Sequence, residues 1–415
     1  MKTAILHYSA PPEIGGVEAV IHAHAFQFAE AGLPLTIIAG RGDSSALPRS
    51  VAFRCVAEID TMNPEIAAAT AELNRGNIPD SFESLVDRLT EQLRPLLKPF
   101  DHLVVHNVLT KHFNLPLTAA LFRLMDEGTI AHTVAWCHDL TWSSPNSRNK
   151  VYESFPWNLL KTVHKHVTYV AISQQRKNEI VQTFGLPPQD IPVIHNGVDP
   201  AVLLNFSEVG AALIDRLNLW ADELILIMPV RVTSAKNIEY AMQVLAALKT
   251  MNKRVRLVLT GPPDPHDSSS MEYYQSLLEL RKSLDVEHEM CFVFESGPQP
   301  GSGYLIDQRV VADLYHMADI MFMPSHREGF GMSILEAGLL GLPVFATSVP
   351  AVQDLDITKS FIFSLDTPPQ QLAEQILNWT KDNPEYLLRA RVRQGYTWKA
   401  IFEQDLLPLL TDSRD

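Results

Sequence analysis

The sequence predicts an α/β protein built from two doubly wound parallel sheets. Short apolar runs of strand length alternate with helix-length amphipathic segments, and the apolar runs fall into two series along the chain. The 415 residues, of which 46% are hydrophobic, suffice for two well-developed cores. Because near-continuous apolar strands are typical of sheets covered on both faces, each series is expected to form one such sheet.

The two series of apolar runs define the expected domains. The first series has runs at residues 3–8, 34–39, 51–56, 102–106, 130–137 and 167–172. The second series has runs at residues 224–229, 255–260, 290–294, 319–323 and 343–347, separated by helical patterns such as 237–249 and 271–285. Turn residues at 195–200, with no apolar run before Leu224, place a hinge between about 196 and 221.

We therefore expect a first domain at residues 1–198, a second domain at 199–395 and a final segment at 396–415. Sheets of this kind bind ligands beyond the carboxyl ends of their strands. Two of them facing each other would place the ligand in a cleft between the domains.

The composition excludes several classes of partner. The formal net charge is −14 and no run of Lys and Arg is long, so nucleic acid is not an expected partner. No uninterrupted apolar stretch is long enough to cross a bilayer, so no transmembrane segment is expected. The three cysteines, Cys55, Cys137 and Cys291, lie in apolar surroundings, which predicts buried reduced thiols and a cytoplasmic protein.

Residues 326–337, with the sequence HREGFGMSILEA, carry most of the functional signal. Glu328 is expected in the loop that follows the apolar run 319–323, and Glu336 on the helix that follows this loop. Carboxylate oxygens accept hydrogen bonds from hydroxyl groups but repel a bare phosphate ligand. The two glutamates therefore suit the hydroxyls of a sugar and of a ribose.

The loop between these glutamates suits a phosphate group. Gly329 and Gly331, on either side of Phe330, let a ligand approach the backbone closely. Unpaired N–H groups at the start of the following helix favour the negative charge of a diphosphate. Together with the two carboxylates, this loop predicts a sugar-nucleotide site.

Arg231 and Lys236 follow the apolar run 224–229, and their spacing lets both cations reach one anion. We interpret them as a clamp for a diphosphate, because fixed cations stabilise the charge that builds up on a departing nucleoside diphosphate. With such a clamp no metal ion is required, and no metal site is expected.

Two further positions lie where ligands of α/β proteins gather. Gly15 and Gly16 open a helical pattern after the first apolar run and permit close backbone approach. His138 follows the run 130–137, at the carboxyl end of an expected strand. No Gly-x-Gly-x-x-Gly follows the first strand, which disfavours a dinucleotide oxidoreductase.

The glutamate pair resembles the motif of the retaining glycosyltransferases of the GT-B fold, family 4. The arginine followed five positions later by a lysine matches the phosphate-binding pair of this family. Residues 170–173 (VAIS), 193–199 (VIHNGVD) and 396–399 (YTWK), with the amphipathic tail to Leu410, are similar to other motifs of the family. The resemblance extends over nearly the whole chain.

The resemblance implies a role for each matching residue. Glu328 would touch the transferred sugar and Glu336 would bind the ribose. Backbone amides of residues 329–331 would hold sugar hydroxyls and phosphate. Gly16 would face the donor, and His138 would contact the donor sugar near the reacting carbon. The final segment would cross back onto the first domain, which would bind the acceptor.

The implied activity is that of a retaining hexosyltransferase (EC 2.4) that works without a metal or another cofactor. The donor would be a nucleoside diphosphate sugar, with a UDP-sugar favoured and a GDP- or ADP-sugar possible. The acceptor hydroxyl could belong to a small sugar, a sugar acid or phosphate, a lipid-linked glycan or a protein. Alternatives are a sugar phosphorylase or a sugar-nucleotide epimerase on the same fold, and a non-catalytic sugar-nucleotide sensor.

Overall fold

The computed structural model consists of two compact units, Met1–Gly197 together with the chain from Trp398 onward, and Val198–Thr397. The structure describes residues 1–251, 254–266, 269–299, 301–354 and 361–411. Each unit contains one six-stranded sheet in which every strand pair is parallel. The predicted pair of doubly wound parallel sheets is confirmed.

The sheet of the first unit has the strand order β3-β2-β1-β4-β5-β6. Its strands are β1 (Thr3–His7), β2 (Leu35–Ala39), β3 (Ala52–Cys55), β4 (His102–His106), β5 (His132–Cys137) and β6 (Val167–Ala171). Its helices are α1 (Gly16–Glu30), α2 (Pro64–Leu73), α3 (Phe82–Leu97), α4 (Leu115–Asp126), α5 (Gln174–Phe184), α15 (Trp398–Ile401) and α16 (Leu407–Thr411), with a π-helical stretch at Phe402–Leu406.

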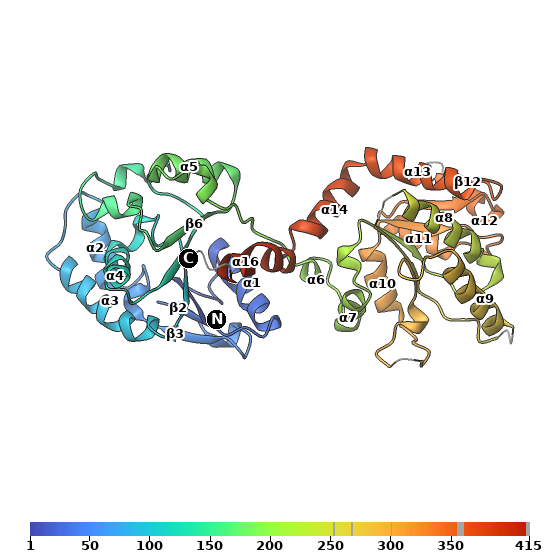
Figure 1. Ribbon diagram of the computed structural model, residues 1–415, viewed down its shortest axis with the longest axis horizontal. Helices are drawn as coiled ribbons and strands as arrows, with labels where there is room; N and C mark the ends of the chain where they lie inside the picture. The colour runs from blue at the N-terminus through green and yellow to red at the C-terminus, as the bar shows by residue number, and fades with distance from the viewer. Residues whose placement is uncertain (252–253, 267–268, 300, 355–360, 412–415) are drawn as a thin grey trace. The chain divides into compact units, whose positions relative to one another are not determined.

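Alternating side chains of these strands enter two cores, because successive residues of a strand point to opposite faces. Ala4 and Leu6 of β1 pack in the core beneath α3 and α4, whereas Ile5 packs in the core beneath α1. Figure 1 shows α2, α3 and α4 on one side of the sheet and α1 and α16 on the other. Phe402, from the end of the chain, lies against Phe28 of α1 with ring centroids 5.1 Å apart.

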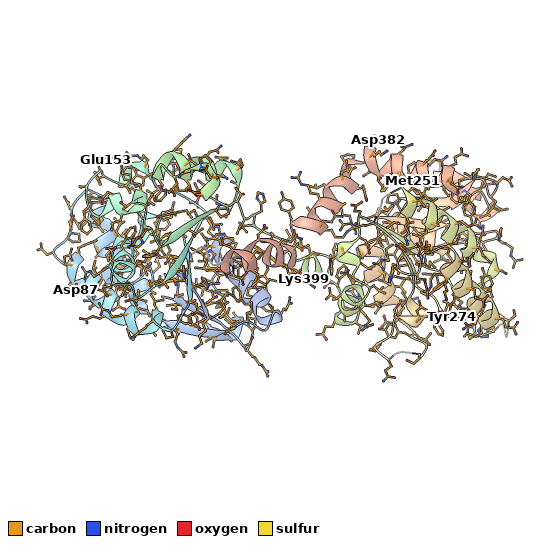
Figure 2. The ribbon with its side chains drawn as sticks, in the orientation of Figure 1. Asp87, Glu153, Met251, Tyr274, Asp382 and Lys399 are labelled. Carbon is orange, nitrogen blue, oxygen red and sulfur yellow. The ribbon has the colours of Figure 1, made fainter. Side chains whose placement is uncertain are left out.

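The sheet of the second unit has the order β12-β11-β10-β7-β8-β9. Its strands are β7 (Leu224–Met228), β8 (Val255–Leu259), β9 (Met290–Phe292), β10 (Ile320–Met323), β11 (Val344–Thr347) and β12 (Phe361–Phe363). Its helices are α6 (Pro200–Leu203), α7 (Glu208–Arg216), α8 (Ile238–Thr250), α9 (Ser270–Ser283), α10 (Gln308–Met317), α11 (Met332–Leu339), α12 (Pro350–Asp354), α13 (Pro369–Asp382) and α14 (Pro384–Gly395). Side chains fill the layers between each sheet and its helices (Figure 2).

Several boundaries differ from the prediction. The region expected to be a hinge, residues 196–221, contains α6 and α7, and Leu213 and Ile214 of α7 are buried in a core of the second unit. The units divide at 197/198 and 397/398, next to the predicted divisions at 198/199 and 395/396. The last four residues of the predicted final segment, 412–415, lie outside the described residues.

The prediction that all three thiols are buried is wrong for Cys55. Cys137 and Cys291 are buried, but Cys55 is exposed because β3 is the edge strand and only β2 flanks it. No helix within the described ranges is long and apolar enough to cross a membrane.

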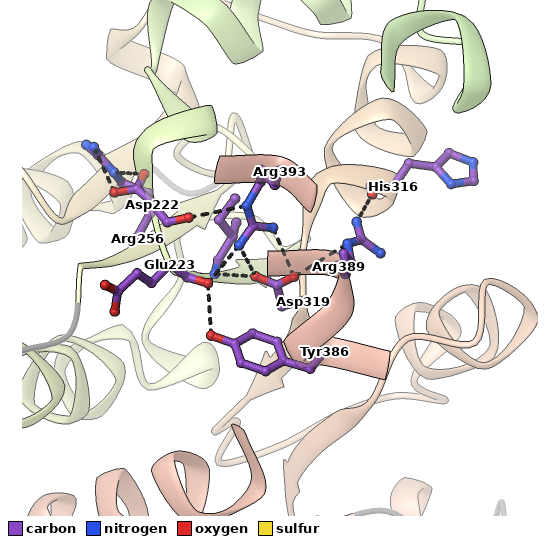
Figure 3. A network of polar contacts seen from close by, with 9 residues as sticks. Asp222, Glu223, Arg256, His316, Asp319, Tyr386, Arg389 and Arg393 are labelled. Carbon is purple, nitrogen blue, oxygen red and sulfur yellow. Dashed lines mark hydrogen bonds and ion pairs between the residues drawn. The ribbon is translucent and has the colours of Figure 1, made fainter. Parts of the chain in front are cut away.

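A buried ion pair holds the amino ends of β7 and β10 together. The carboxylate of Asp319 accepts hydrogen bonds from the Arg393 guanidinium at 3.0 and 2.9 Å and from the Ile225 backbone N–H at 2.9 Å. Arg393 also donates to the carbonyl oxygens of Asp222 and Glu223 (Figure 3). The side chains of Asp319 and Arg393 are only 1% and 4% exposed. The charges of Asp319 and Arg393 are thus paired away from water, while Arg389, 3.5 Å from the Asp319 carboxylate, is 41% exposed.

Asp319→Asn should lower the free energy of unfolding by about 3 kcal/mol or more, because it leaves the buried Arg393 charge without its counterion. Denaturant unfolding measures this change. Asp285→Asn is the matched control. Asp285 forms an ion pair with Lys249 at 3.2 Å but is 90% exposed, so the control should change stability by less than about 0.5 kcal/mol. Equal effects of the two substitutions would contradict the account.

Candidate active site

The candidate site of the second unit lies where the strand order of its sheet reverses. β7 is followed by β8 and β9 on one side, and the chain then crosses to place β10 on the other side of β7. The register pairs Ile320 with Leu226 and Met321 with Ile227. In doubly wound sheets the crevice beyond the carboxyl ends of two such strands is the usual ligand site. The loops after β7 and β10 carry Arg231, Lys236 and Glu328.

An ion pair between Lys236 and Glu328 joins these two loops. The Lys236 Nζ atom lies 2.8 Å from both carboxylate oxygens of Glu328. The two side chains are 21% and 8% exposed, so the pair is largely shielded from water. The backbone N–H of His326 also donates to the carbonyl oxygen of Ala235 at 2.9 Å. These two contacts therefore hold the loops after β7 and β10 together where the strand order reverses.

Ser325 orients the Glu328 carboxylate and was not predicted. Its hydroxyl donates to Glu328 Oε1 at 2.5 Å, and its carbonyl oxygen accepts a hydrogen bond of 2.6 Å from the Thr347 hydroxyl. Ser325 is fully buried. With Lys236 and Ser325 as donors, the carboxylate has little freedom to rotate, as a group that positions a substrate requires. In the sequence, this role is indicated only by the position of Ser325 shortly after the apolar run 319–323.

Among the described residues, Arg231 and Lys236 have no ion-pair partner in common. Its guanidinium lies 3.5 Å from the carboxylate of Asp264, and its side chain is 56% exposed. The predicted clamp on one anion therefore stays a prediction, since the structure pairs each cation with a different carboxylate. An exposed Arg231 is free to exchange Asp264 for a ligand phosphate at small cost, because a surface ion pair contributes little.

The loop between the two glutamates presents backbone to solvent. Gly329 and Phe330 are exposed. Gly331 precedes α11 with φ at +84°, a left-handed conformation that favours glycine. Among the described residues no side chain caps the amino end of α11. The Ile334 N–H donates to the Gly331 carbonyl oxygen at 2.9 Å, which leaves the N–H groups of Met332 and Ser333 for an anion.

Glu336 lies on α11 and is held by Tyr315 of α10. The Tyr315 hydroxyl donates to Glu336 Oε2 at 2.7 Å, while Glu336 itself is exposed. Burial, reinforced by the Glu336 carboxylate, raises the pKa of Tyr315, so the phenol stays a hydrogen-bond donor. Tyr315 was not predicted because 21 residues separate it from Glu336 and no local pattern connects them.

In the first unit the strand order reverses between β1 and β4. Gly16 is exposed at the first position of α1, after the loop that follows β1. The carboxylate of Glu18 folds back over this helix end and accepts a hydrogen bond of 2.5 Å from the Ser9 hydroxyl. A Cβ atom on Gly15 would lie 2.1 Å from Glu18 Oε2, so a larger residue there would require the Glu18 side chain to move.

His138 follows β5 and is nearly buried. The side-chain oxygen of Asn107 accepts hydrogen bonds from the backbone N–H groups of His138 and Asp139, at 2.9 and 3.1 Å. The His138 Nε2 atom lies 3.0 Å from Nδ1 of His106. Burial lowers the pKa of His138 to about 3. His138 is therefore a neutral imidazole, able to hydrogen bond but not to supply positive charge.

No group of three or more His, Cys, Asp or Glu side chains in the described part of the chain is arranged to hold a metal ion. Activity without a metal or cofactor stays a prediction.

Comparison with known families gives two matches that together extend over most of the chain. The model of the family described as "Glycosyltransferase Family 4" matches residues 14–202, and that described as "Glycosyl transferases group 1" matches residues 212–396. The fold and the two family matches define a GT-B glycosyltransferase. The chain belongs to the GT-B glycosyltransferases of family 4.

Curated relatives match part of the chain. A D-inositol 3-phosphate glycosyltransferase of Kineococcus radiotolerans is 29% identical over 43% of this chain and 39% of its own length. A mannosylglucosylglycerate synthase of Petrotoga mobilis is 24% identical over 65% of this chain and 63% of its own length. The chain therefore spans less than two thirds of the length of either relative.

Solved structures match along the whole chain at low identity. Anabaena HepE in complex with UDP is 17% identical, with 99% of each chain covered and a TM-score of 0.36. Sucrose-phosphate synthase from Thermosynechococcus elongatus is 18% identical, with 99% of each chain covered and a TM-score of 0.39.

The buried imidazole of His24 makes the stability of the first unit depend on pH. Both ring nitrogens of His24 lack hydrogen-bond partners among the described residues, and burial lowers its pKa from 6.5 to about 3. Between these values the unfolded chain binds a proton that the folded chain does not bind, so stability falls as the pH falls. His24→Leu removes this proton linkage. The free energy of unfolding of the variant minus that of wild type should therefore rise by about 2 kcal/mol between about pH 7.5 and about pH 5. Denaturant unfolding at both pH values tests this, and an unchanged difference would contradict it.

Proposed function

We propose that this protein transfers a glycosyl group from a nucleoside diphosphate sugar to an acceptor hydroxyl, with retention of anomeric configuration. The observation that carries the proposal is the Lys236–Glu328 pair, held at 2.8 Å at the switch point of the second sheet. In the proposed reaction Lys236 is the cation for the leaving group, and Glu328 is the carboxylate for the sugar hydroxyls. Membership of family 4 supports sugar transfer, and so do the names of both relatives, which denote sugar-transferring enzymes.

The chemistry needs stabilisation of charge on both fragments. Breaking the anomeric bond gives the sugar oxocarbenium character and leaves negative charge on the diphosphate. Lys236, Arg231 and the free N–H groups of α11 offer positive charge and hydrogen-bond donors to those phosphate oxygens. We propose that these groups, rather than a metal ion, stabilise the leaving group.

Glu328 acts in this proposal on the sugar hydroxyls. With Lys236 and Ser325 bound to it, its carboxylate is charged, oriented and shielded from water. We propose that it positions the transferred sugar and that the leaving phosphate takes the proton of the acceptor hydroxyl. Glu336, held by Tyr315 through Oε2, keeps Oε1 for the ribose.

The first unit contributes Gly16 and His138 to the proposed reaction. The exposed backbone at Gly16 allows close approach of the donor phosphates. His138, as a neutral imidazole, would hydrogen bond to the donor sugar near the reacting carbon. We further propose that the acceptor binds this unit. A UDP-sugar is the favoured donor, with GDP- and ADP-sugars as the other candidates.

Glu328→Gln tests the role of the carboxylate. Turnover of the preferred nucleotide sugar should fall by about a hundredfold or more, because the amide cannot replace an oriented charge in the transition state. Binding of the free nucleoside diphosphate should persist or tighten, since Lys236 loses its competing counterion. Product formation and calorimetric binding measure the two effects.

The matched control for Glu328→Gln is Glu374→Gln. Glu374 is exposed on α13, far along the chain from the motif, so its substitution should change neither quantity. Near-normal turnover of Glu328→Gln would contradict the assigned role.

A thermal-shift panel of UDP-, GDP- and ADP-sugars should identify the donor. A ligand at a hundred times its dissociation constant stabilises the protein by about 2.7 kcal/mol. The true donor should give the largest shift and should be consumed only when an acceptor is added. Dependence on inorganic phosphate would indicate a phosphorylase, product without an acceptor an epimerase, and saturable binding without consumption a sensor.

A further inference from the structure

The end of β4 and the residue that follows it hold His138 at two points. The side-chain oxygen of Asn107 accepts hydrogen bonds from the backbone N–H groups of His138 and Asp139. His106, the last residue of β4, has its Nδ1 atom 3.0 Å from Nε2 of His138. His106 is fully buried and His138 is 7% exposed. Two consecutive residues therefore fix both the main chain and the ring of His138.

The contact between the two imidazoles has the geometry of a well-aligned hydrogen bond. The ring centroids of His106 and His138 are 5.3 Å apart, and the ring planes differ by 23°. This separation is close to the largest that two imidazole rings can have when a nitrogen of one lies 3.0 Å from a nitrogen of the other. Both nitrogens thus lie almost on the line between the ring centres. An imidazole N–H and an imidazole lone pair both point along this direction, as a strong hydrogen bond requires.

One of the two rings must donate and the other must accept, because both are neutral. Burial lowers the pKa of His106 well below its usual value and that of His138 to about 3. The other ring nitrogen of His106, Nε2, is buried and has no hydrogen-bond partner among the described residues. A buried N–H group without an acceptor is rarer in proteins than a buried acceptor without a donor. The proton of His106 therefore belongs on Nδ1, from which it is donated to Nε2 of His138.

We propose that His106 is a positioning residue that holds His138 as its Nδ1–H tautomer, so that this N–H donates to an oxygen of the transferred sugar. The inference deepens the proposed function and rests on it for the contact with the sugar. The hydrogen bond made by one imidazole nitrogen determines whether the other nitrogen carries the proton. Nδ1 of His138 has no hydrogen-bond partner among the described residues, which leaves it for a substrate. Without His106, the Nε2–H form that an unconstrained histidine favours would turn Nδ1 into an acceptor.

Nitrogen NMR of the full chain with isotope-labelled histidine tests the tautomer, because it reports which nitrogen of an imidazole carries the proton. At about pH 7.5, wild-type His138 should carry its proton on Nδ1, with Nε2 unprotonated. His138→Asn identifies the signals by their loss. His106→Phe keeps the shape of the ring but has no N–H to donate, so the proton of His138 should move largely to Nε2.

Turnover gives a second measurement on the same variants. His106→Phe should lower kcat by about tenfold, the effect of one misdirected hydrogen bond, and should change KM for the nucleotide sugar by less than about threefold. His106→Asn keeps a side-chain N–H near the position of Nδ1, so it should restore the Nδ1–H form of His138 and most of the turnover. A residue that served packing alone would give the opposite order, because phenylalanine fills the space of histidine better than asparagine does.

His24→Leu is the matched control. His24 is also buried, and its ring centroid lies 5.8 Å from that of His106, but neither of its ring nitrogens has a hydrogen-bond partner among the described residues. At the same pH this variant should leave the tautomer of His138 and kcat unchanged. A His138 proton on Nε2 in wild type, or equal losses of turnover in His106→Phe, His106→Asn and His24→Leu, would overturn the proposal.

The two measurements separate this inference from the proposed function. If the tautomer responds to His106→Phe as expected but no nucleotide sugar is consumed, the hydrogen bond stands and the proposed function is wrong. If sugar is transferred while His106→Phe leaves the tautomer of His138 unchanged, only the role of His106 is wrong.

Discussion

The parallel pairing of β10 with β7 is the constraint on which the candidate site depends. At the amino ends of these strands, Asp319 accepts a hydrogen bond from the Ile225 N–H and is neutralised by Arg393. At their carboxyl ends, the two following loops meet through the Lys236–Glu328 pair. Because β10 reaches β7 only after the chain has reversed its strand order, residues about 90 positions apart come together. The ion pair between the loops is a consequence of the topology.

Most of the sheet structure could be predicted because strands buried on both faces have continuous apolar sequences. The exposed edge strands carry less of this signal. β12 has only three residues and was not predicted, and Cys55 of edge strand β3 was wrongly expected to be buried. The prediction of a hinge at residues 196–221 was wrong for another reason. α7 is amphipathic and buries only Leu213 and Ile214 with Gly210, which is too weak a pattern to separate from turn residues in the sequence.

The candidate site could be predicted in part. Motif spacing identified Glu328, Glu336 and Lys236, since spacing along the chain fixes which loop or helix carries each residue. Hydrogen-bond and ion-pair partners from other helices and loops could not be predicted, because no local sequence pattern connects them to these residues. Tyr315 holds Glu336 from a neighbouring helix, and Arg231 pairs with Asp264 from a different loop.

A crystal structure of this protein with UDP bound would test the central claim most directly. The account predicts that the diphosphate contacts Lys236 Nζ and the first N–H groups of α11, with the ribose hydroxyls within hydrogen-bonding distance of Glu336. The account would be contradicted if UDP bound away from the loops after β7 and β10 and made no contact with Lys236 or Glu328.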